Sequence, residues 1–238
     1  MHVLCLGILH HTLGSALWEL LLEDAWPVPD HAGGPWQLLR QKQLQLAYAD
    51  FLEWAKHNHV EHSERSKWTL AKLKMMTLSS PPFMKFKAGN SMRMLAWMES
   101  ICARRAREVP SVHNRLRHNC LWGYNTAVTT MKNTSLVLTD AEAAILDETR
   151  EAALLSHASL RAEALGLGQV TWHTVPKHHY YDHCIRHASR FRLNPVYHWA
   201  FMDEDLMGNI KLIALTCSGV TREARVLERF LIGVFEDS

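Results

Sequence analysis

The chain is organised around residues Val175 to Cys217, which read VPKHHYYDHCIRHASRFRLNPVYHWAFMDEDLMGNIKLIALTC. This stretch holds the densest group of histidines in the chain and its only run of three acidic residues. Asn194-Pro195 interrupts it, because the residue before a proline is disfavoured in helical conformation. The apolar spacing on either side predicts helices over residues 177–189 and 203–216.

The remaining helical predictions follow the same periodicity. Thr139 and Glu142 form a capping-box pattern, which predicts the start of a long helix that ends near Gly166 and Gly168. Weaker patterns suggest strands at 4–9, 170–175 and 196–200. Further helices are predicted within 1–24 (Leu13, Leu17, Leu20, Leu21 apolar), 36–57 (buried stripe Leu39, Leu46, Ala49, Trp54), 66–76, 87–108, 111–131 and 221–236. The expected fold is therefore mainly α, with few or no strands.

Composition places the chain among proteins with a sizeable core. It has 238 residues, and its five cysteines are scattered without CxxC pairs, as is typical of reduced thiols in an intracellular compartment. No run reaches the roughly 18 apolar residues that a membrane span needs, so we expect no membrane partner. The apolar start lacks the basic region and the cleavage site of a signal peptide.

Charge is distributed unevenly although the net charge is only +2. Residues 61–120 hold 12 Lys and Arg against 4 Asp and Glu, which leaves the rest of the chain acidic. This basic region predicts contacts with an anionic partner, with nucleic acid as the first candidate. The alternative is that its basic residues are simply solvated on the outer faces of helices. The aromatic residues among them, Trp68, Phe83, Phe86 and Trp97, are expected in the core. The candidate DNA-contacting residues are Lys72, Lys74, Lys85, Lys87, Arg93, Arg104, Arg105 and Arg107.

The histidines of the organising stretch suggest a metal site, against which a packing role has to be weighed. His179, His183 and His187 lie four residues apart, so a helix places all three on one face. Two such histidines suit zinc, but there is no HExxH motif and no second ligand pair at a recognisable spacing. We therefore favour packing or hydrogen bonding for these histidines and predict no bound metal.

The acidic run Asp203-Glu204-Asp205 also has two interpretations. Its carboxylates could hold a divalent metal, but acidic residues at a helix start are more simply explained as caps. The sequence contains no GxGxxG, GxxxxGK[ST] or GxSxG motif, which leaves nucleotide-binding and hydrolase functions without support.

Several short motifs resemble those of DDE transposases of the CACTA-like and KDZ-like groups, which have RNase H-like cores. Met1-His2 followed by Leu6-Gly7-Ile8-Leu9 and Gly14 is similar to their "D-x-M-H … L-G-V … H … G" segment. Pro176-Lys177-His178-His179 with His183 resembles "P-K-x-H-x-x-x-H". Phe201 to Lys211 resembles "F-E-x-x-H-x-x-x-K", which places Glu204 at the family's glutamate.

The resemblance implies a helical insertion-type domain over 25–170, between core-derived segments at 1–24 and 171–238. The family's two aspartates would precede Met1, and Met207 and Gly208 stand in the region of the later histidine. Glu204 would therefore be catalytic only if upstream acids completed the site, with Mg²⁺ or Mn²⁺ as cofactor only then. Two-metal catalysis needs several carboxylates, so the expected protein is a fragment of an incomplete RNase H-like core without catalysis of its own.

The expected function is thus sequence-independent DNA binding, with a nuclear location if DNA is the partner. One alternative is a helical protein-interaction module without a nucleic-acid function. A second is a zinc enzyme built on His179 and His183, which would bind about one zinc ion per chain. A third is a decayed fragment whose exposed apolar surface causes self-association.

Overall fold

The computed structural model describes residues 3–29, 35–63, 67–77, 79–198 and 225. The chain divides into two compact units, Met1–Tyr197 and His198–Ser238. The described residues lie almost entirely in the first unit. The division at 24 and 170 that the transposase resemblance implies stays a prediction.

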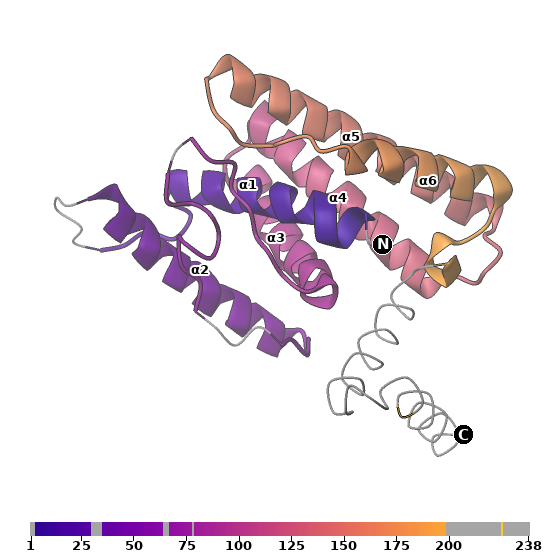
Figure 1. Ribbon diagram of the computed structural model, residues 1–238, viewed down its shortest axis with the longest axis horizontal. Helices are drawn as coiled ribbons and strands as arrows, with labels where there is room; N and C mark the ends of the chain where they lie inside the picture. Colours follow the sequence, from indigo (N-terminus) through magenta and orange to yellow (C-terminus); the bar gives the residue numbers. More distant parts are fainter. Residues whose placement is uncertain (1–2, 30–34, 64–66, 78, 199–224, 226–238) are drawn as a thin grey trace. The chain divides into compact units, whose positions relative to one another are not determined.

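The regular secondary structure of the described part of the chain is helical and includes no β-sheet, which confirms the mainly α prediction (Figure 1). One isolated antiparallel bridge, between Val137 and Leu193, is its only β-type pairing. The elements are η1 (Leu4–Ile8), α1 (Leu9–Leu22), α2 (Trp36–His57), α3 (Ala88–Glu108), α4 (Val112–Asn133), α5 (Asp140–Gly166), α6 (Lys177–Phe191) and η2 (Pro195–His198).

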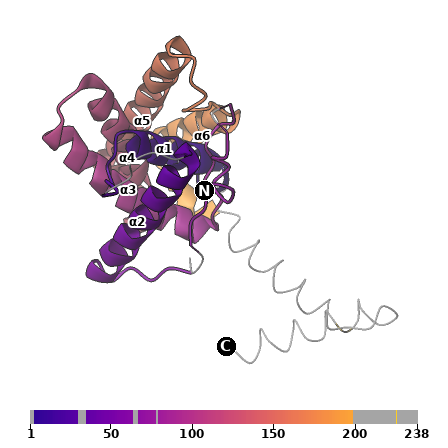
Figure 2. The ribbon, with the colours of Figure 1, turned by 90° about the vertical axis from the view of Figure 1, so that its left-hand side faces the viewer.

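Helix α1 forms the centre of the unit, with the longer helices around it (Figures 1 and 2). The predicted apolar residues Leu13, Leu17, Leu20 and Leu21 are all fully buried. Contrary to the prediction from the sequence, the segment Leu4–Leu22 is long and apolar enough to cross a membrane by length and composition, but 89% of its most apolar window is buried inside the protein. In this structure it is the core helix of the unit.

Helices α4 and α5 form the closest helix pair, and a glycine permits their approach. A Cβ atom at Gly123 would lie 2.5 Å from the Thr149 carbonyl oxygen and 2.9 Å from Ala153 Cβ. The predicted capping box at the start of α5 is present, since Thr139 Oγ1 accepts from the Glu142 N–H and the Glu142 carboxylate accepts from the Thr139 N–H. Backbone N–H groups at the start of α5 are thereby satisfied by side chains of the same segment, without any neighbouring helix.

Four local predictions were wrong, and one of them is the strand at 196–200, whose described residues lie in the 3₁₀-helix η2. Residues 4–9 are helical rather than a strand, and 170–175 form no strand because no neighbouring segment pairs with them. Short apolar runs do not distinguish buried strand from buried helix, which explains the error over 4–9. In place of a helix over 66–76, the described residues 67–77 form turns, and Lys74 has a φ of 51°, which a helix does not permit.

The buried face of α2 also differs from the predicted one. Leu46 is 42% exposed and Ala49 is exposed, whereas Leu44, Ala47 and Phe51 are buried. The mean direction of the apolar residues is poorly defined in α2, so neighbouring helices decide which side is covered. Phe51 stacks on Trp68 with ring centroids 5.9 Å apart and thereby fixes that side.

An irregular segment crosses α1, and we call residues 67–77 and 79–87 the crossing segment. The Met84 N–H donates to the His10 carbonyl oxygen over 2.9 Å. At Gly14 a Cβ atom would lie 2.7 Å from the backbone of Pro82, so only glycine permits this approach. Trp68 and Phe86 of the segment are buried, as is Trp97 beside them, which confirms the predicted core position of these three residues, whereas Phe83 is only half-buried.

Candidate functional site

The predicted metal-site histidines lie in a row on the exposed side of α6. The rings of His179 and His183 are 4.3 Å apart, whereas the ring of His187 stacks on Phe191 at 4.4 Å. Nowhere in the described ranges do three or more His, Cys, Asp or Glu side chains converge on a position suited to a metal ion. The neighbouring Asp182 is held by Arg150 at 2.5 Å and by Arg186 at 3.0 Å, so its carboxylate serves the α5–α6 contact.

The predicted carboxylate Glu204 lies outside the described residues, as do Asp203, Asp205, Met207 and Gly208. Its assignment as the family's glutamate therefore stays a prediction. In the described part, the buried carboxylates bind cations and indole nitrogens.

The predicted DNA-contacting residues fall into two groups at opposite ends of α3. Lys87 precedes the helix and Arg105 lies in its last turn, so they are separated by about 27 Å along the axis. Three of the four arginines already have partners. Arg104 lies 4.0 Å from Glu108, Arg105 lies 3.7 Å from Glu23, and Arg93 donates to Asn90. Arg104 and Arg105 thus have acidic neighbours, which distinguishes them from the lysines.

The lysines on the crossing segment occupy a different environment. Residues 67–98 contain no Asp or Glu, and within the described structure Lys74, Lys85 and Lys87 form no ion pair. Lys74 lies over the Phe83 ring at 4.8 Å and Lys72 over the Phe86 ring at 5.6 Å. The aromatic rings anchor the segment inward, and the ammonium groups of these lysines remain at the surface.

Lys177 at the start of α6 extends this basic group. Burial lowers the pKa of His10 below its ordinary value, and the charges of Lys177 and Lys85 lower it further. Both lysines therefore lie near the same histidine, whose Nε2 donates a hydrogen bond to the Phe86 carbonyl oxygen at 3.1 Å. We call Lys74, Lys85, Lys87 and Lys177 the lysine group.

A buried charge network that our sequence analysis did not predict lies between α1 and α4. Arg117 is fully buried and binds Glu23 through two hydrogen bonds of 2.7 and 2.8 Å, with Glu19 at 3.4 Å. Glu19 also accepts from Trp172 Nε1 at 2.6 Å and contacts His113 at 3.0 Å. Paired in this way, the carboxylates hold α1 and α4 together.

The hydrogen bonds and charges of this network shift the pKa values of His113 and Glu23. The hydrogen bond with Glu19 is the largest cause that raises the pKa of His113 to about 9, and a second hydrogen bond with Glu163 adds to it. Burial alone would raise the pKa of Glu23, but the hydrogen bond and charge of Arg117 lower it below its ordinary value. The network is therefore charged on both sides at neutral pH.

A second unforeseen feature is a cluster of imidazoles from α1, α5 and α6. The rings of His157 and His178 lie 4.3 Å apart, and those of His11 and His173 lie 5.2 Å apart. Burial lowers the pKa of His157 to about 3 and that of His11 to about 4. His157 and His11 are therefore uncharged at neutral pH. His178 Nδ1 donates to the Val175 carbonyl oxygen at 3.1 Å.

The lysine group is thus the arrangement in the described unit best suited to an anionic ligand, and the remaining charged groups are mostly committed to each other. Comparison with known proteins matches the chain to no family model, to no curated protein and to no solved structure.

Proposed function

We propose that this unit is a non-catalytic helical module that binds the phosphate backbone of nucleic acid through the lysine group. The resemblance to the helical insertion of DDE transposases leads to the same proposal, since such an insertion would contact DNA without cutting it. The arginines at the end of α3 are excluded from the contact surface.

One observation carries the proposal, namely that the crossing segment has several lysines and no acidic residue and is fixed to the core helix by aromatic side chains. Lys74 and Lys85 therefore keep their charge available to a partner, whereas Arg105 does not. Fixed cations of one sign raise the local concentration of a polyanion and release its counterions on contact. Contacts to phosphate groups do not distinguish one base from another, so binding would be independent of the nucleic-acid sequence.

The test is a salt titration of binding to a labelled DNA duplex, followed by fluorescence anisotropy. The triple variant carries Lys74→Asn, Lys85→Gln and Lys87→Gln, with asparagine at 74 because it tolerates the positive φ there. Each lost phosphate contact lowers the slope of log K against log salt by about 0.9, so we expect a reduction of about 3.

The matched control is the double variant Arg104→Gln and Arg107→Gln, for which we expect an unchanged slope. Binding that is absent at low salt, or equal slopes for the wild type and the lysine variant, would contradict the proposal. A slope reduced only in the arginine control would restore the arginines as the contact surface.

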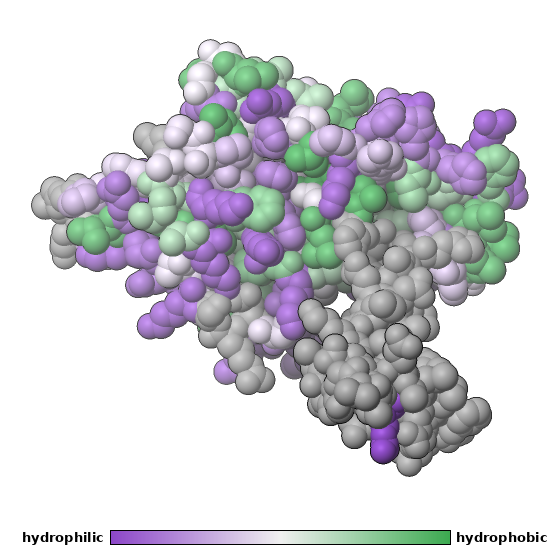
Figure 3. Space-filling view, viewed as in Figure 1, coloured by the Kyte–Doolittle hydropathy of each residue, from purple (hydrophilic) through white to green (hydrophobic). Residues whose placement is uncertain are grey.

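An apolar surface favours the protein-interaction module as a second candidate. Val137 is 64% exposed and Tyr197 is 56% exposed, and Leu136 and Leu193 lie beside them, at the end of α6 where Figure 3 shows a green area. Light scattering of the wild type and of Val137→Ser tests it through self-association. If the wild type and Val137→Ser are both monomeric at all concentrations, self-association through this apolar surface is excluded.

A further inference from the structure

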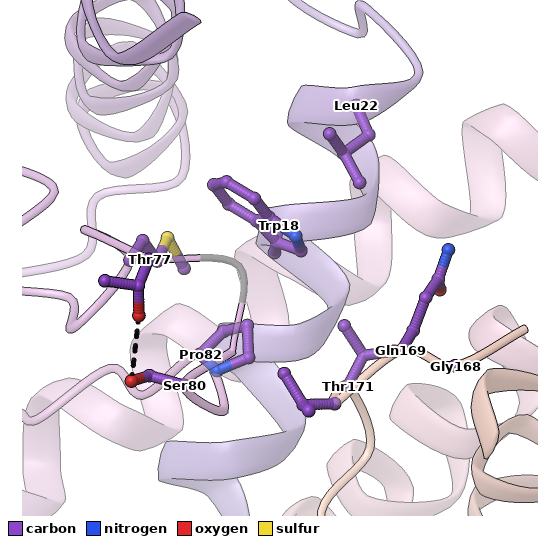
Figure 4. A pocket seen from close by; sticks show the side chains of 10 residues that line it. Trp18, Leu22, Thr77, Ser80, Pro82, Gly168, Gln169 and Thr171 are labelled. Atoms are coloured by element: carbon purple, nitrogen blue, oxygen red, sulfur yellow. Dashed lines mark hydrogen bonds between the residues drawn. The ribbon is translucent and has the colours of Figure 1, made fainter.

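Two cavities of the described unit differ in the charge of the side chains that line them. The cavity of about 340 Å³ between α1, the crossing segment and residues 168–171 has no charged side chain in its wall (Figure 4). The hydroxyls of Thr77 and Ser80 in that wall bond to each other over 3.0 Å, as the dashed line in Figure 4 shows. This cavity therefore offers no charge that would select a ligand.

The second cavity, of about 230 Å³, lies between the end of α2, the first turns of α3 and the last turns of α4. Trp54, Met92 and Val128 contribute apolar surface to its wall. Arg93 and Lys132 line the same cavity, and none of its described lining residues is acidic. The wall therefore combines an apolar surface with two positive charges.

Neutral groups hold the Arg93 guanidinium in place. Its Nη1 donates to Asn90 Oδ1 at 3.3 Å, and Asn90 Nδ2 donates to Ser63 Oγ at 3.0 Å. Asn90 is only 5% exposed, so this pair fixes the guanidinium from the protein side. Gly89 leaves room for it, because a Cβ atom there would lie 3.3 Å from Arg93 Nη1. Arg93 forms no ion pair with any described residue, so its charge is available to a ligand.

Lys132 supplies the second charge from the last turn of α4. Its side chain is exposed and forms no ion pair within the described ranges. Thr129 and Asn125 also line the cavity and lie on the same face of α4 as Lys132, one and two turns before it. Two cations beside one cavity repel each other, and an anion bound between them removes that repulsion.

We propose that this cavity binds a small organic carboxylate, with the carboxylate between Arg93 and Lys132 and an apolar body against Trp54 and Met92. A guanidinium presents a planar fork that matches a carboxylate, and a mostly apolar wall with a few polar groups is usual for a small-molecule site. An apolar cavity of about 150 Å³ holds one benzene ring, so the volume here admits a body of about one or two rings.

This site goes beyond the proposed nucleic-acid binding and does not depend on it. No member of the lysine group lines the cavity. The lysine group presents an open surface to a polyanion, whereas the cavity admits only a small anion and adds apolar contacts to the charge.

Isothermal titration calorimetry at pH 7 and low salt tests the site with 2-naphthoate, its neutral analogue 2-naphthamide, and acetate. We expect saturable binding of 2-naphthoate and binding of the other two that is at least about 10-fold weaker, because each lacks either the charge or the apolar body. Arg93→Gln should weaken 2-naphthoate binding about 10-fold. Lys132→Gln should weaken it by up to about 5-fold, because Lys132 is exposed. Arg115→Gln is the matched control, since it removes the same charge about 26 Å away along α4 and should bind as the wild type does.

A blocking variant tests the position of the ligand by a second route. Thr129 is exposed, so Thr129→Trp can fill the cavity without disturbing the core, and we expect it to abolish 2-naphthoate binding. Asn119→Trp, at an exposed position of α4 outside the cavity, is its control and should bind normally. The proposal is overturned if 2-naphthoate does not bind, if acetate or 2-naphthamide binds as tightly, or if Arg93→Gln or Thr129→Trp binds as the wild type does.

Discussion

Arg117→Met is the most direct probe of what holds the core helix against its neighbours. The guanidinium is fully buried and forms two short hydrogen bonds with Glu23 and a longer one with Glu19. Methionine occupies a similar length of apolar stem but cannot neutralise either carboxylate. The variant therefore leaves negative charge in the interface between α1 and α4.

The size of the effect depends on how well the two carboxylates can be compensated without Arg117. Loss of one partner of a buried ion pair costs about 3–5 kcal/mol of unfolding free energy. The Glu23 side chain is 30% exposed and keeps Arg105 at 3.7 Å, and Glu19 keeps His113 and Trp172. We therefore expect the lower end, about 3 kcal/mol, which corresponds to a fall in Tm of about 6–12 °C for a domain of this size.

Urea unfolding followed by far-UV circular dichroism measures the change. Arg115→Met is the control, because Arg115 lies exposed on the same helix, and surface changes usually stay within about 0.5 kcal/mol. The double variant Arg117→Met, Glu23→Leu removes both charges and should recover part of the loss. If Arg117→Met and the control unfold at the same urea concentration, the ion pair has no stabilising function and the reasoning fails.

Three further predictions concern the fold. His157 has a pKa near 3 in the folded protein against 6.5 unfolded, so its stabilising contribution is full above pH 6.5 and is lost as the pH falls towards 3. His113 acts in the opposite direction, since its pKa is near 9 and its contribution is lost as the pH rises from 6.5 through 9. Tm measured against pH should therefore peak near 6.5, and an acid limb unchanged by His157→Phe would contradict the first half. Gly123→Ala should destabilise by about 1–3 kcal/mol in urea unfolding, because the added Cβ overlaps α5, and wild-type stability would show that the helices can separate at no cost. Thr139→Ala should cost about 1 kcal/mol through loss of the cap on α5, whereas Thr139→Ser should restore stability.

Most of the fold could be predicted from the sequence, because its helices carry their own boundary signals. The capping box at Thr139 starts α5, and Pro110 separates α3 from α4. The errors occur where local signals are weak. The residues around Lys74 have helical composition, but the chain turns there to reach α1, and only a tertiary contact at Gly14 explains the turn.

The candidate sites were less predictable, because a sequence counts charges without showing which of them are paired. Arg105 looked equivalent to Lys87, yet Glu23 lies beside it in space although it comes much earlier in the chain. One signal for the buried network was present, since Glu19 and Glu23 stand four residues apart on an otherwise apolar helix. Acidic residues in that setting need buried cations.

The central position of α1 has a consequence for biosynthesis. Ser15 of this helix binds the backbone of Trp172, which leaves the ribosome 157 residues later. At about 5–20 residues per second, roughly 8–30 s pass before that contact can form. During this interval a strongly apolar helix lacks its covering partners and offers a surface to chaperones and to other nascent chains. Slow translation between residues 22 and 172 should therefore lower the yield of soluble protein more than slow translation elsewhere.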